Sequence, residues 1–474
     1  MATSEASPFA KTGGLADVLG SLPGALKKQG VDVRVIMPKY GTIPAHLHEN
    51  IVHNCYIYVN LGWRNLYCGI EELEYNGVIY YFIDNEYYFN RDNLYSYDDD
   101  FERYAFFCKA VMAAIPFLCF TPDIIHCHDW QTGMIPVLLE SNYRKQEQYR
   151  DISTMFTIHN LKYQGIYGIK EMKDWFDLDD SYFTDDKLEF YGSGSFMKGG
   201  LVYANILTTV SETYAQEIKN SFYGEGMEGL LNARSNDLFG VVNGIDYDEF
   251  NPAKDKFIVQ NYTKSKLKDK GVNKMALQEE LNLTVGEDIP MIGLISRLVD
   301  QKGLDLIGCV FEEIMSEEIQ FVALGTGNEQ YERLFAGAVY RFPGKVSANI
   351  RFDNELAHKI YAAADFFLMP SLFEPCGLGQ LISLRYGTLP IVRETGGLKD
   401  TVFSYNEETG EGNGFSFANY NAHDMLNTIR RALSIYRRKT LRTQLRKSAM
   451  SCDCSWSNSA SKYIELYRQL KPGL

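Results

Sequence analysis

The sequence predicts an α/β protein with two large domains. Its 474 residues exceed what one compact core organises, so a division into two domains is expected. In both halves, short apolar runs typical of buried parallel strands alternate with segments of helical spacing. Glycines and polar residues follow these strands at the position where parallel sheets present ligand-binding groups.

The first helix is expected from residue 15, because leucines and valines recur there at helical spacing, and a strand follows at residues 31–37. Lys11, Gly13 and Gly14 stand just ahead of this helix, where backbone N–H groups and the helix dipole can receive an anion. A glycine-rich connection with a solvated lysine is the competing interpretation.

Aromatic, β-rich segments with glycine and asparagine turns predict strands between residues 51 and 84. The tract at residues 85–101 combines tyrosines with acidic residues, so we expect a surface loop. Carbohydrate stacking on the tyrosines is the alternative, since aromatic faces pack well on sugar rings.

Two further strands, at residues 123–128 and 153–158, end in polar residues. His126 and His128 share one face of the first strand, but no further metal ligand lies nearby, which favours a sugar contact or a structural role. His159 follows the second strand, and this position at the end of a strand favours a ligand contact over a core histidine.

The second half repeats the alternation after a lysine-rich stretch at residues 261–282, which we expect to be a surface helix and linker. A strand at residues 290–296 leads to Arg297 and Lys302 ahead of a helix. Two cations between a strand and a helix suit a diphosphate. The competing interpretation is that both side chains are simply solvated at the surface.

Residues 372–400 form the most informative stretch of the chain. Glu374 follows an apolar strand, and Gly377 lets the backbone approach a bound molecule. A second strand at residues 388–393 leads into Gly396 and Gly397 ahead of another helix. A carboxylate beside two glycine turns suits a hydroxyl-rich ligand that carries phosphate.

Bulk properties exclude several classes of function. A net charge of −14 argues against broad binding to nucleic acid or anionic membranes. The nine scattered cysteines indicate free thiols in a reducing compartment. The longest apolar run, residues 104–120, contains Lys109 and is too short to span a bilayer. With no signal peptide evident, we expect a cytoplasmic protein.

Five motifs in order over nearly the whole chain carry a resemblance to a known family. They read KTGGLADV, HCHDW, FTIHNLKYQG, SRLVDQKG and FEPCGLGQL with YGTLPIVRETGGLKDTV. The chain thereby resembles bacterial glycogen synthases and plant starch synthases. The resemblance implies the GT-B fold, two Rossmann-like domains facing a deep interdomain cleft. It also implies retaining transfer of glucose from ADP-glucose to the non-reducing end of an α-1,4-glucan such as glycogen, without a cofactor.

The resemblance implies an N-terminal domain at residues 1–240, a nucleotide-sugar-binding domain at residues 241–450, and a segment at residues 451–474 that crosses back to the first domain. One departure concerns the start. Family members begin with a hydrophobic strand that should be central in the first sheet, and here only residues 1–3 stand in its place.

The site residues that the resemblance implies fall into two groups. The catalytic residues are Glu374, His159, Arg297 and Lys302. The substrate-binding residues are Lys11, Gly13, Gly14, Asp17, Asp129, Asn160, Asn243, Phe352, Cys376, Gly377, Leu378, Thr395, Gly396 and Gly397. Phe352 stands where relatives often carry the tyrosine that stacks on adenine, and phenylalanine can still stack.

A front-face mechanism is expected, because many related enzymes carry a second glutamate eight residues after the first and this chain has Ile382 there. The leaving phosphate oxygen would accept the proton of the attacking hydroxyl, and Arg297 and Lys302 would stabilise the diphosphate in place of a metal. Three alternatives stay open: a related enzyme that uses UDP-glucose or another acceptor, a glycogen phosphorylase, and an inactive glucan-binding protein.

Overall fold

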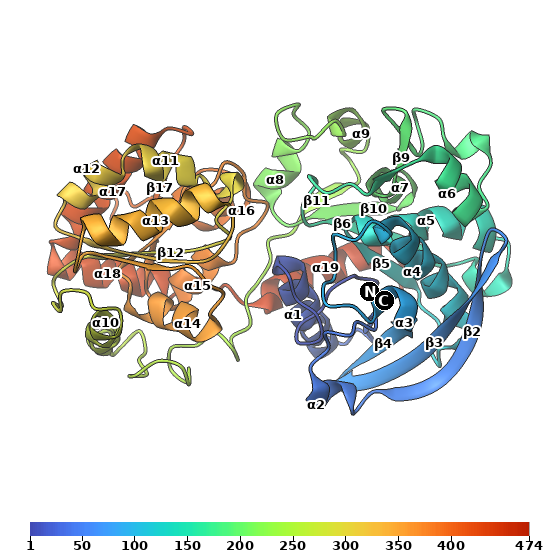
Figure 1. Cartoon of the computed structure of the whole chain (residues 1–474), viewed down its shortest axis with the longest axis horizontal. Helices are drawn as coiled ribbons and strands as arrows, with labels where there is room; N and C mark the ends of the chain where they lie inside the picture. Colours follow the sequence, from blue (N-terminus) through green and yellow to red (C-terminus); the bar gives the residue numbers. More distant parts are fainter. Residues whose placement is uncertain (474) are drawn as a thin grey trace. The chain divides into compact units, whose positions relative to one another are not determined.

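The computed structural model describes residues 1–473, and the chain divides into two compact units (Figure 1). Unit 1 combines Met1–Val242 with Trp456–Leu474, and unit 2 is Asn243–Ser455. The chain returns to unit 1 at Trp456 rather than at residue 451, because Ile245 pairs with Ser455 and its N–H donates to the Cys454 carbonyl at 2.8 Å. Within residues 1–473, no helix is both long enough and apolar enough to cross a membrane.

The main strands of unit 1 form two four-stranded sheets, ordered β1-β4-β3-β2 and β11-β10-β6-β5. Pairing is parallel except where β3 meets β2 and β4, and a small sheet of β7, β9 and β8 lies apart from them. The strands are β1 (Arg34–Pro38), β2 (Val52–Leu61), β3 (Arg64–Tyr75), β4 (Val78–Asp84), β5 (Ile124–His128), β6 (Ser153–Ile158), β7 (Ile166–Tyr167), β8 (Glu189–Phe190), β9 (Ser193–Ser195), β10 (Ile206–Thr209) and β11 (Leu238–Gly240).

A three-residue stub at the start of the chain joins the two sheets. Ala2 forms parallel bridges to Ile36 of β1 on one side and to Cys127 of β5 on the other. Its N–H donates to the His126 carbonyl at 2.8 Å, and its carbonyl accepts from the His128 N–H at 3.1 Å. Ala2 is fully buried. Ala2 therefore pairs with a strand on each side, as a residue of a central strand does.

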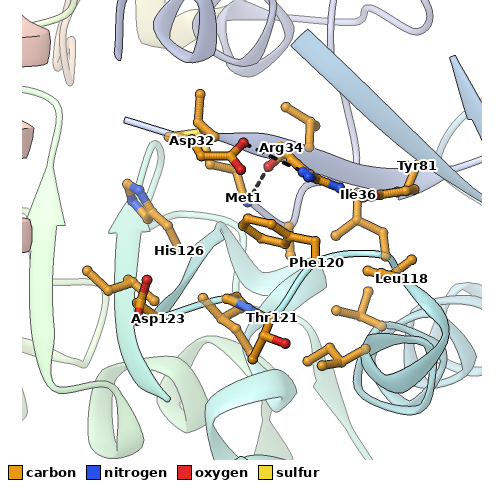
Figure 2. A pocket seen from close by; sticks show the side chains of 18 of the residues that line it. Met1, Asp32, Arg34, Ile36, Tyr81, Leu118, Phe120, Thr121, Asp123 and His126 are labelled. Carbon is orange, nitrogen blue, oxygen red and sulfur yellow. Dashed lines mark hydrogen bonds and ion pairs between the residues drawn. The ribbon is translucent and has the colours of Figure 1, made fainter. Parts of the chain in front are cut away.

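A pocket of about 400 Å³ lies between the amino-terminal parts of β1 and β5, next to this stub (Figure 2). Met1, Ile36, Phe120 and His126 are among the residues around it. The Met1 amine donates to the Arg34 carbonyl at 2.7 Å on one wall. Met1 and Ala2 of the stub line this pocket together with residues of β1 and β5.

The C-terminal helix packs against α1, and the Gln29 amide donates to the Ser457 carbonyl at 2.8 Å. Trp456, Tyr463 and Tyr467 of this helix belong to the core of unit 1. The helices are α1 (Gly14–Lys28), α2 (Ala45–His48), α3 (Glu86–Phe89), α4 (Asp100–Ala114), α5 (Met134–Leu138), α6 (Ile169–Phe176), α7 (Phe196–Tyr203), α8 (Glu212–Glu217), α9 (Glu228–Ala233) and α19 (Trp456–Leu470).

Unit 2 has one parallel six-stranded sheet in the order β14-β13-β12-β15-β16-β17. Counted along the chain this is 3-2-1-4-5-6, the doubly wound order, in which ligands bind where the order reverses, outside the carboxyl ends of the strands. That switch point lies between β12 and β15. The strands are β12 (Met291–Ile295), β13 (Gln320–Leu324), β14 (Val346–Asn349), β15 (Phe366–Met369), β16 (Leu389–Arg393) and β17 (Phe415–Phe417).

Helices connect the successive strands of unit 2, because parallel strands need crossover connections. They are α10 (Asp269–Glu280), α11 (Leu304–Cys309), α12 (Phe311–Ser316), α13 (Glu329–Arg341), α14 (Asn354–Ala363), α15 (Gly379–Arg385), α16 (Gly396–Thr401), α17 (Ala422–Tyr436) and α18 (Lys439–Ala449).

The expected lysine-rich surface helix is wrong in one respect, because α10 buries two of its lysines. Lys270 donates to the carbonyls of Tyr361 and Ala362 at 3.1 and 2.8 Å, and so satisfies the last turn of α14. Lys274 forms an ion pair with Asp365 at 2.7 Å, and both side chains are almost fully buried. The lysine-rich composition predicted side chains exposed to solvent, but these two lysines are buried and donate hydrogen bonds inside unit 2.

The stub makes a direct prediction about stability. Ala2→Asp places an unpaired carboxylate between two strands and should cost unit 1 about 3 kcal/mol or more of unfolding free energy. Tryptophan fluorescence during denaturant unfolding measures this, because all four tryptophans (Trp63, Trp130, Trp175 and Trp456) lie in unit 1. Ala45→Asp, at the exposed start of α2, is the matched control. Equal midpoints for the two variants would contradict the role given to the stub.

Candidate active site

An ion pair marks the switch point of unit 2. Lys302 Nζ lies 2.6 Å from Glu374 Oε2, and the two side chains are 17% and 8% exposed. The Ser371 hydroxyl donates to the same carboxylate oxygen at 3.1 Å. Lys302 comes from the turn after β12 and Glu374 from the loop after β15, so the pair lies where a doubly wound sheet binds ligands.

Backbone contacts hold these two loops together. Gly303 has φ +69°, and a Cβ there would lie 2.0 Å from the Pro370 carbonyl oxygen, so glycine is required. The Leu372 N–H donates to the Gln301 carbonyl at 2.9 Å. The buried Arg393, at the end of β16, donates from Nε to the Ser371 carbonyl at 2.8 Å. Glu374 therefore stands on a fixed loop.

Gly396 and Gly397, which begin α16, pack against the Glu374 backbone. Gly396 has φ +43°, and a Cβ there would lie 2.0 Å from the Glu374 carbonyl oxygen. The Gly397 N–H donates to the carbonyls of Glu374 and Pro375 at 3.2 and 3.1 Å. Thr395 precedes the two glycines as the fully buried N-cap of α16. The structure thus brings together Thr395, Gly396 and Gly397 with Glu374.

Asn243 and Cys376 meet beside this loop. Burial raises the pKa of the Cys376 thiol to about 12, and the backbone of Asn243 acts against this shift. Asn243 Oδ1 is buried and has no hydrogen-bond partner within residues 1–473. A buried acceptor without a donor is costly, so a ligand donor at this position would remove a penalty of about 1–3 kcal/mol.

Four more of the predicted residues lie at the surface of unit 2 or in its turns. Gly377 has φ +75° and leads into Leu378, which caps α15. Arg297 is exposed after β12, and its guanidinium makes no ion pair with another described residue. Phe352 is 84% exposed in the loop between β14 and α14. Both exposed side chains are accessible to a ligand.

In unit 1, the ends of β5 and β6 bring Asp129, His159 and Asn160 together. Asp129 Oδ1 accepts from the backbone N–H groups of His159 at 2.7 Å and Asn160 at 3.4 Å. Burial raises the pKa of Asp129 to about 7, against the effect of those two donors. Asp129 also has φ +58°, a strained conformation for a residue with a side chain.

His159 also belongs to a row of three neighbouring histidine rings, with His128 and His126. The ring centroids of His126 and His128 lie 4.1 Å apart, and His128 Nδ1 lies 3.0 Å from His159 Nε2. Burial lowers the pKa of His159 to about 3 and holds the pKa values of the other two well below their ordinary value. A neutral imidazole ring has one nitrogen that donates a hydrogen bond and one that accepts.

His126 is hydrogen-bonded within the protein. Among residues 1–473, no three histidine, cysteine, aspartate or glutamate side chains are grouped so as to hold a metal ion. His126 shares hydrogen bonds with Tyr467 at 2.7 Å and Thr157 at 2.6 Å, which tie α19 to the sheet. His126 therefore has a structural role, as one of the two interpretations of the sequence predicted.

The loop before α1 contains a residue that the sequence analysis missed. The buried Glu5 carboxylate accepts from the N–H groups of Thr12 at 2.5 Å and Gly13 at 3.3 Å, and from the Tyr95 hydroxyl at 2.6 Å. The predicted anion position beside Gly13 is therefore filled by the protein's own carboxylate. Glu5 lies ahead of the KTGGLADV motif and belongs to no periodic pattern, so the sequence alone did not mark it.

Lys11 does not point into that loop but pairs with Asp17 of α1 at 2.6 Å, and the two side chains are 42% and 25% exposed. Burial raises the pKa of Asp17 in spite of the lysine. Gly14 is the first residue of α1.

The predicted tyrosine-rich surface loop at residues 85–101 is partly wrong as well, because Tyr88 and Phe89 are buried in the core and Tyr95 binds Glu5.

The fold and the site define the class of protein. Residues 279–450, which contain the Lys302–Glu374 pair, match the family described as "Glycosyl transferases group 1". The sucrose-phosphate synthase of Thermosynechococcus elongatus shares the fold with a TM-score of 0.64 at 17% identity, covering 100% of this chain and 98% of that one. The chain is a glycosyltransferase with the GT-B fold.

Closer relatives identify the family. Residues 1–233 match the family described as "Starch synthase catalytic domain". The glycogen synthases of Geobacillus thermodenitrificans and Lachnospira eligens are 54% and 56% identical over 469 and 470 residues, covering 99% and 98% of this chain and 97% and 98% of theirs. The catalytic domain of Arabidopsis thaliana starch synthase IV, solved with ADP and acarbose, superposes with a TM-score of 0.93 at 34% identity over 99% of this chain and 98% of that one. The chain belongs to the glycogen and starch synthase family.

The neutral histidines predict a dependence of stability on pH. Their folded-state pKa values lie below the unfolded value near 6.5, so they contribute stability that is present above pH 6.5 and is lost as the pH falls. Each histidine should cost about 1.4 kcal/mol per pH unit below its unfolded pKa. Asp129, with its raised pKa, acts in the opposite direction.

Because the histidines and Asp129 act in opposite directions, the pH dependence of the unfolding free energy is best compared between a histidine variant and the wild type. Between pH 7 and pH 5, His128→Gln should lose less unfolding free energy than the wild type, measured by tryptophan fluorescence in denaturant. His48→Gln, which changes an exposed side chain of α2, should follow the wild type. An identical pH dependence for all three proteins would refute the neutral state assigned to His128.

Proposed function

We propose that this chain transfers glucose from ADP-glucose to the non-reducing end of an α-1,4-glucan, with retention of configuration. The observation that carries the proposal is the Lys302–Glu374 pair at the switch point of unit 2, beside the two glycines that begin α16. It combines a cation for a diphosphate with a carboxylate acceptor for sugar hydroxyls, the two groups that a nucleotide sugar requires.

The residues of unit 2 are assigned to the donor. Arg297 and Lys302 bind the diphosphate, the first with a forked guanidinium and the second as a point charge. Glu374 holds the glucose hydroxyls, and the unpartnered Asn243 Oδ1 accepts from a further donor of the ligand. The exposed ring of Phe352 stacks on the adenine.

The residues of unit 1 are assigned to the transferred glucose and the acceptor. His159 contacts the glucose as a neutral ring, and Asp129 and Asn160 contact the acceptor side. Lys11, with Asp17 as its partner, supplies a further cation for the sugar nucleotide. The remaining substrate-binding residues are assigned to contacts through their backbone, which approaches the substrates closely. They are Gly13, Gly14, Cys376, Gly377, Leu378, Thr395, Gly396 and Gly397.

In the reaction, the acceptor hydroxyl oxygen forms a bond to the anomeric carbon on the face from which ADP departs. The bond from that carbon to the phosphate oxygen breaks, and its electron pair leaves with ADP. A phosphate oxygen takes the proton of the attacking hydroxyl. Arg297 and Lys302 stabilise the charge that grows on the diphosphate, and this stabilisation lowers the barrier because it is greatest in the transition state.

Release of ADP tests the proposal. With ADP-glucose the purified protein should release ADP only when glycogen is present, and UDP-glucose in parallel should be the poorer donor. Arg297→Met should lower kcat/KM about ten- to a hundredfold, since a charge-assisted contact is worth about 1.5–3 kcal/mol. The side chain is exposed, so the fold should not change.

Arg333→Met is the matched control, because Arg333 is 76% exposed and its one ion pair among residues 1–473 is with its helix neighbour Glu329. It should keep wild-type kcat/KM. Absence of release with either donor from the folded wild type would reject the proposed function. Wild-type turnover by Arg297→Met would reject the diphosphate assignment alone.

A further inference from the structure

His128 and His159 form a hydrogen-bonded pair of neutral rings at the ends of β5 and β6. His128 Nδ1 lies 3.0 Å from His159 Nε2, and the two ring centroids lie 5.2 Å apart. The His128 side chain is fully buried, whereas His159 is half-buried. Burial lowers the pKa of both rings, so each ring carries a single proton at neutral pH. One nitrogen of the pair must therefore donate and the other must accept.

The backbone holds both rings at this separation. The His128 N–H donates to the Ala2 carbonyl at 3.1 Å, and the His128 carbonyl accepts from the Thr132 hydroxyl at 3.0 Å. The His159 N–H donates to Asp129 Oδ1 at 2.7 Å. Because both residues are anchored in this way, the hydrogen bond between the two rings is a fixed feature of the strand ends.

The His128 ring has no second hydrogen-bond partner. Among residues 1–473, its buried Nε2 atom makes no hydrogen bond. The neighbouring ring of His126, whose centroid is 4.1 Å away, is already satisfied, because its two nitrogens bond to Tyr467 at 2.7 Å and to Thr157 at 2.6 Å. The nitrogen that carries the proton of a neutral histidine is set by the hydrogen bond that the ring makes. For His128, that bond is the one to His159.

The pair allows two arrangements of its protons. In the first, His128 donates from Nδ1, so that its Nε2 atom is a bare acceptor and His159 carries its proton on Nδ1. In the second, His159 donates from Nε2, which places the His128 proton on Nε2 and buries an N–H group without an acceptor. Folded proteins leave a buried N–H group unpaired less often than they leave an acceptor unpaired. The first arrangement is therefore favoured.

We infer that His128 is a positioning residue that fixes the tautomer of His159, so that His159 presents an Nδ1–H donor to the transferred glucose. His159 Nδ1 makes no hydrogen bond with another described residue, and the half-buried ring leaves it available to a ligand. The inference rests on the proposed function, which assigns the glucose contact to His159. A donor that is oriented before the substrate arrives costs no reorganisation during the reaction.

The ring nitrogens report the tautomer directly. With histidine labelled with ¹⁵N, long-range proton–nitrogen correlation spectra of the full chain without substrate should show His159 protonated on Nδ1. The chain has eight histidines, and the signals that disappear in His159→Asn identify this ring. In His128→Leu, which has no donor for His159 Nε2, the His159 proton should distribute between both ring nitrogens.

Two further variants test the origin of the tautomer. His128→Asn is the conservative change, because its amide N–H reaches the place of Nδ1 and keeps a donor for His159. Tyr467→Phe is the matched control, since it removes a hydroxyl that bonds to His126 but leaves the pair of His128 and His159 intact. Both variants should keep the Nδ1–H tautomer. If His128→Leu does not fold, the wild type and His128→Asn still decide the inference.

Kinetics with ADP-glucose and glycogen give a second readout. His128→Leu should lower kcat about two- to tenfold, as expected for the loss of one neutral hydrogen bond, and should leave the KM for glycogen unchanged. His128→Asn and Tyr467→Phe should keep the wild-type kcat. A role of His128 in stability alone would lower the melting temperature without this pattern in kcat and in the tautomer.

Two results would overturn the inference. The first is a wild-type protein in which His159 carries its proton on Nε2. The second is a His128→Leu protein that keeps the Nδ1–H tautomer or the wild-type kcat. The spectra need no substrate, so they also separate this inference from the proposed function. If His159 shows the expected tautomer and loses it in His128→Leu, but no protein releases ADP, the tautomer assignment stands and the proposed function fails.

Discussion

The ion pair between Lys302 and Glu374 is the interaction on which the site of unit 2 depends. It connects the loop after β12 to the loop after β15, at the place where the strand order reverses. Both side chains are largely removed from water, so removing one partner would leave the other charge buried and unpaired, at a cost of about 3–5 kcal/mol. The surrounding contacts of Gly303, Arg393 and Gly396 serve to hold those two loops at this separation.

In unit 1, two carboxylates are held by hydrogen bonds from the backbone instead of by an ion pair. They are Glu5 and Asp129. The first shapes the loop before α1, and the second orients the backbone of His159. Because the histidines of this row are neutral, the cluster presents hydrogen-bond donors and acceptors without a net positive charge. This character suits a sugar, whereas the exposed and cationic groups of unit 2 suit a diphosphate.

Much of the fold was predictable because its signals are local. Apolar runs and their flanking glycines indicated β5, β6, β12, β15 and β16 within a few residues of their observed bounds. The predicted grouping of Glu374 with the turn at Gly396 also follows from strand ends that meet at one edge of a sheet. The positions of the site residues are local consequences of this kind, although their roles stay predictions.

Other features depended on contacts between distant residues. Glu5 binds a loop seven residues away and Tyr95 much further along the chain, and neither contact leaves a periodic pattern. Lys270 and Lys274 resemble solvated lysines until α14 and Asp365 provide their partners. The stub at Ala2 could be recognised as short, but its pairing on both sides required the structure.

The central claim is that Lys302 and Glu374 act as one unit in transfer. A double-mutant cycle on kcat/KM with Lys302→Met, Glu374→Gln and the double variant tests it most directly. If the pair acts as a unit, the double variant should be about as impaired as the worse single variant, with a coupling free energy of about 1.5 kcal/mol or more. Additive losses, with coupling near zero, would show that the two residues act independently and would contradict this account.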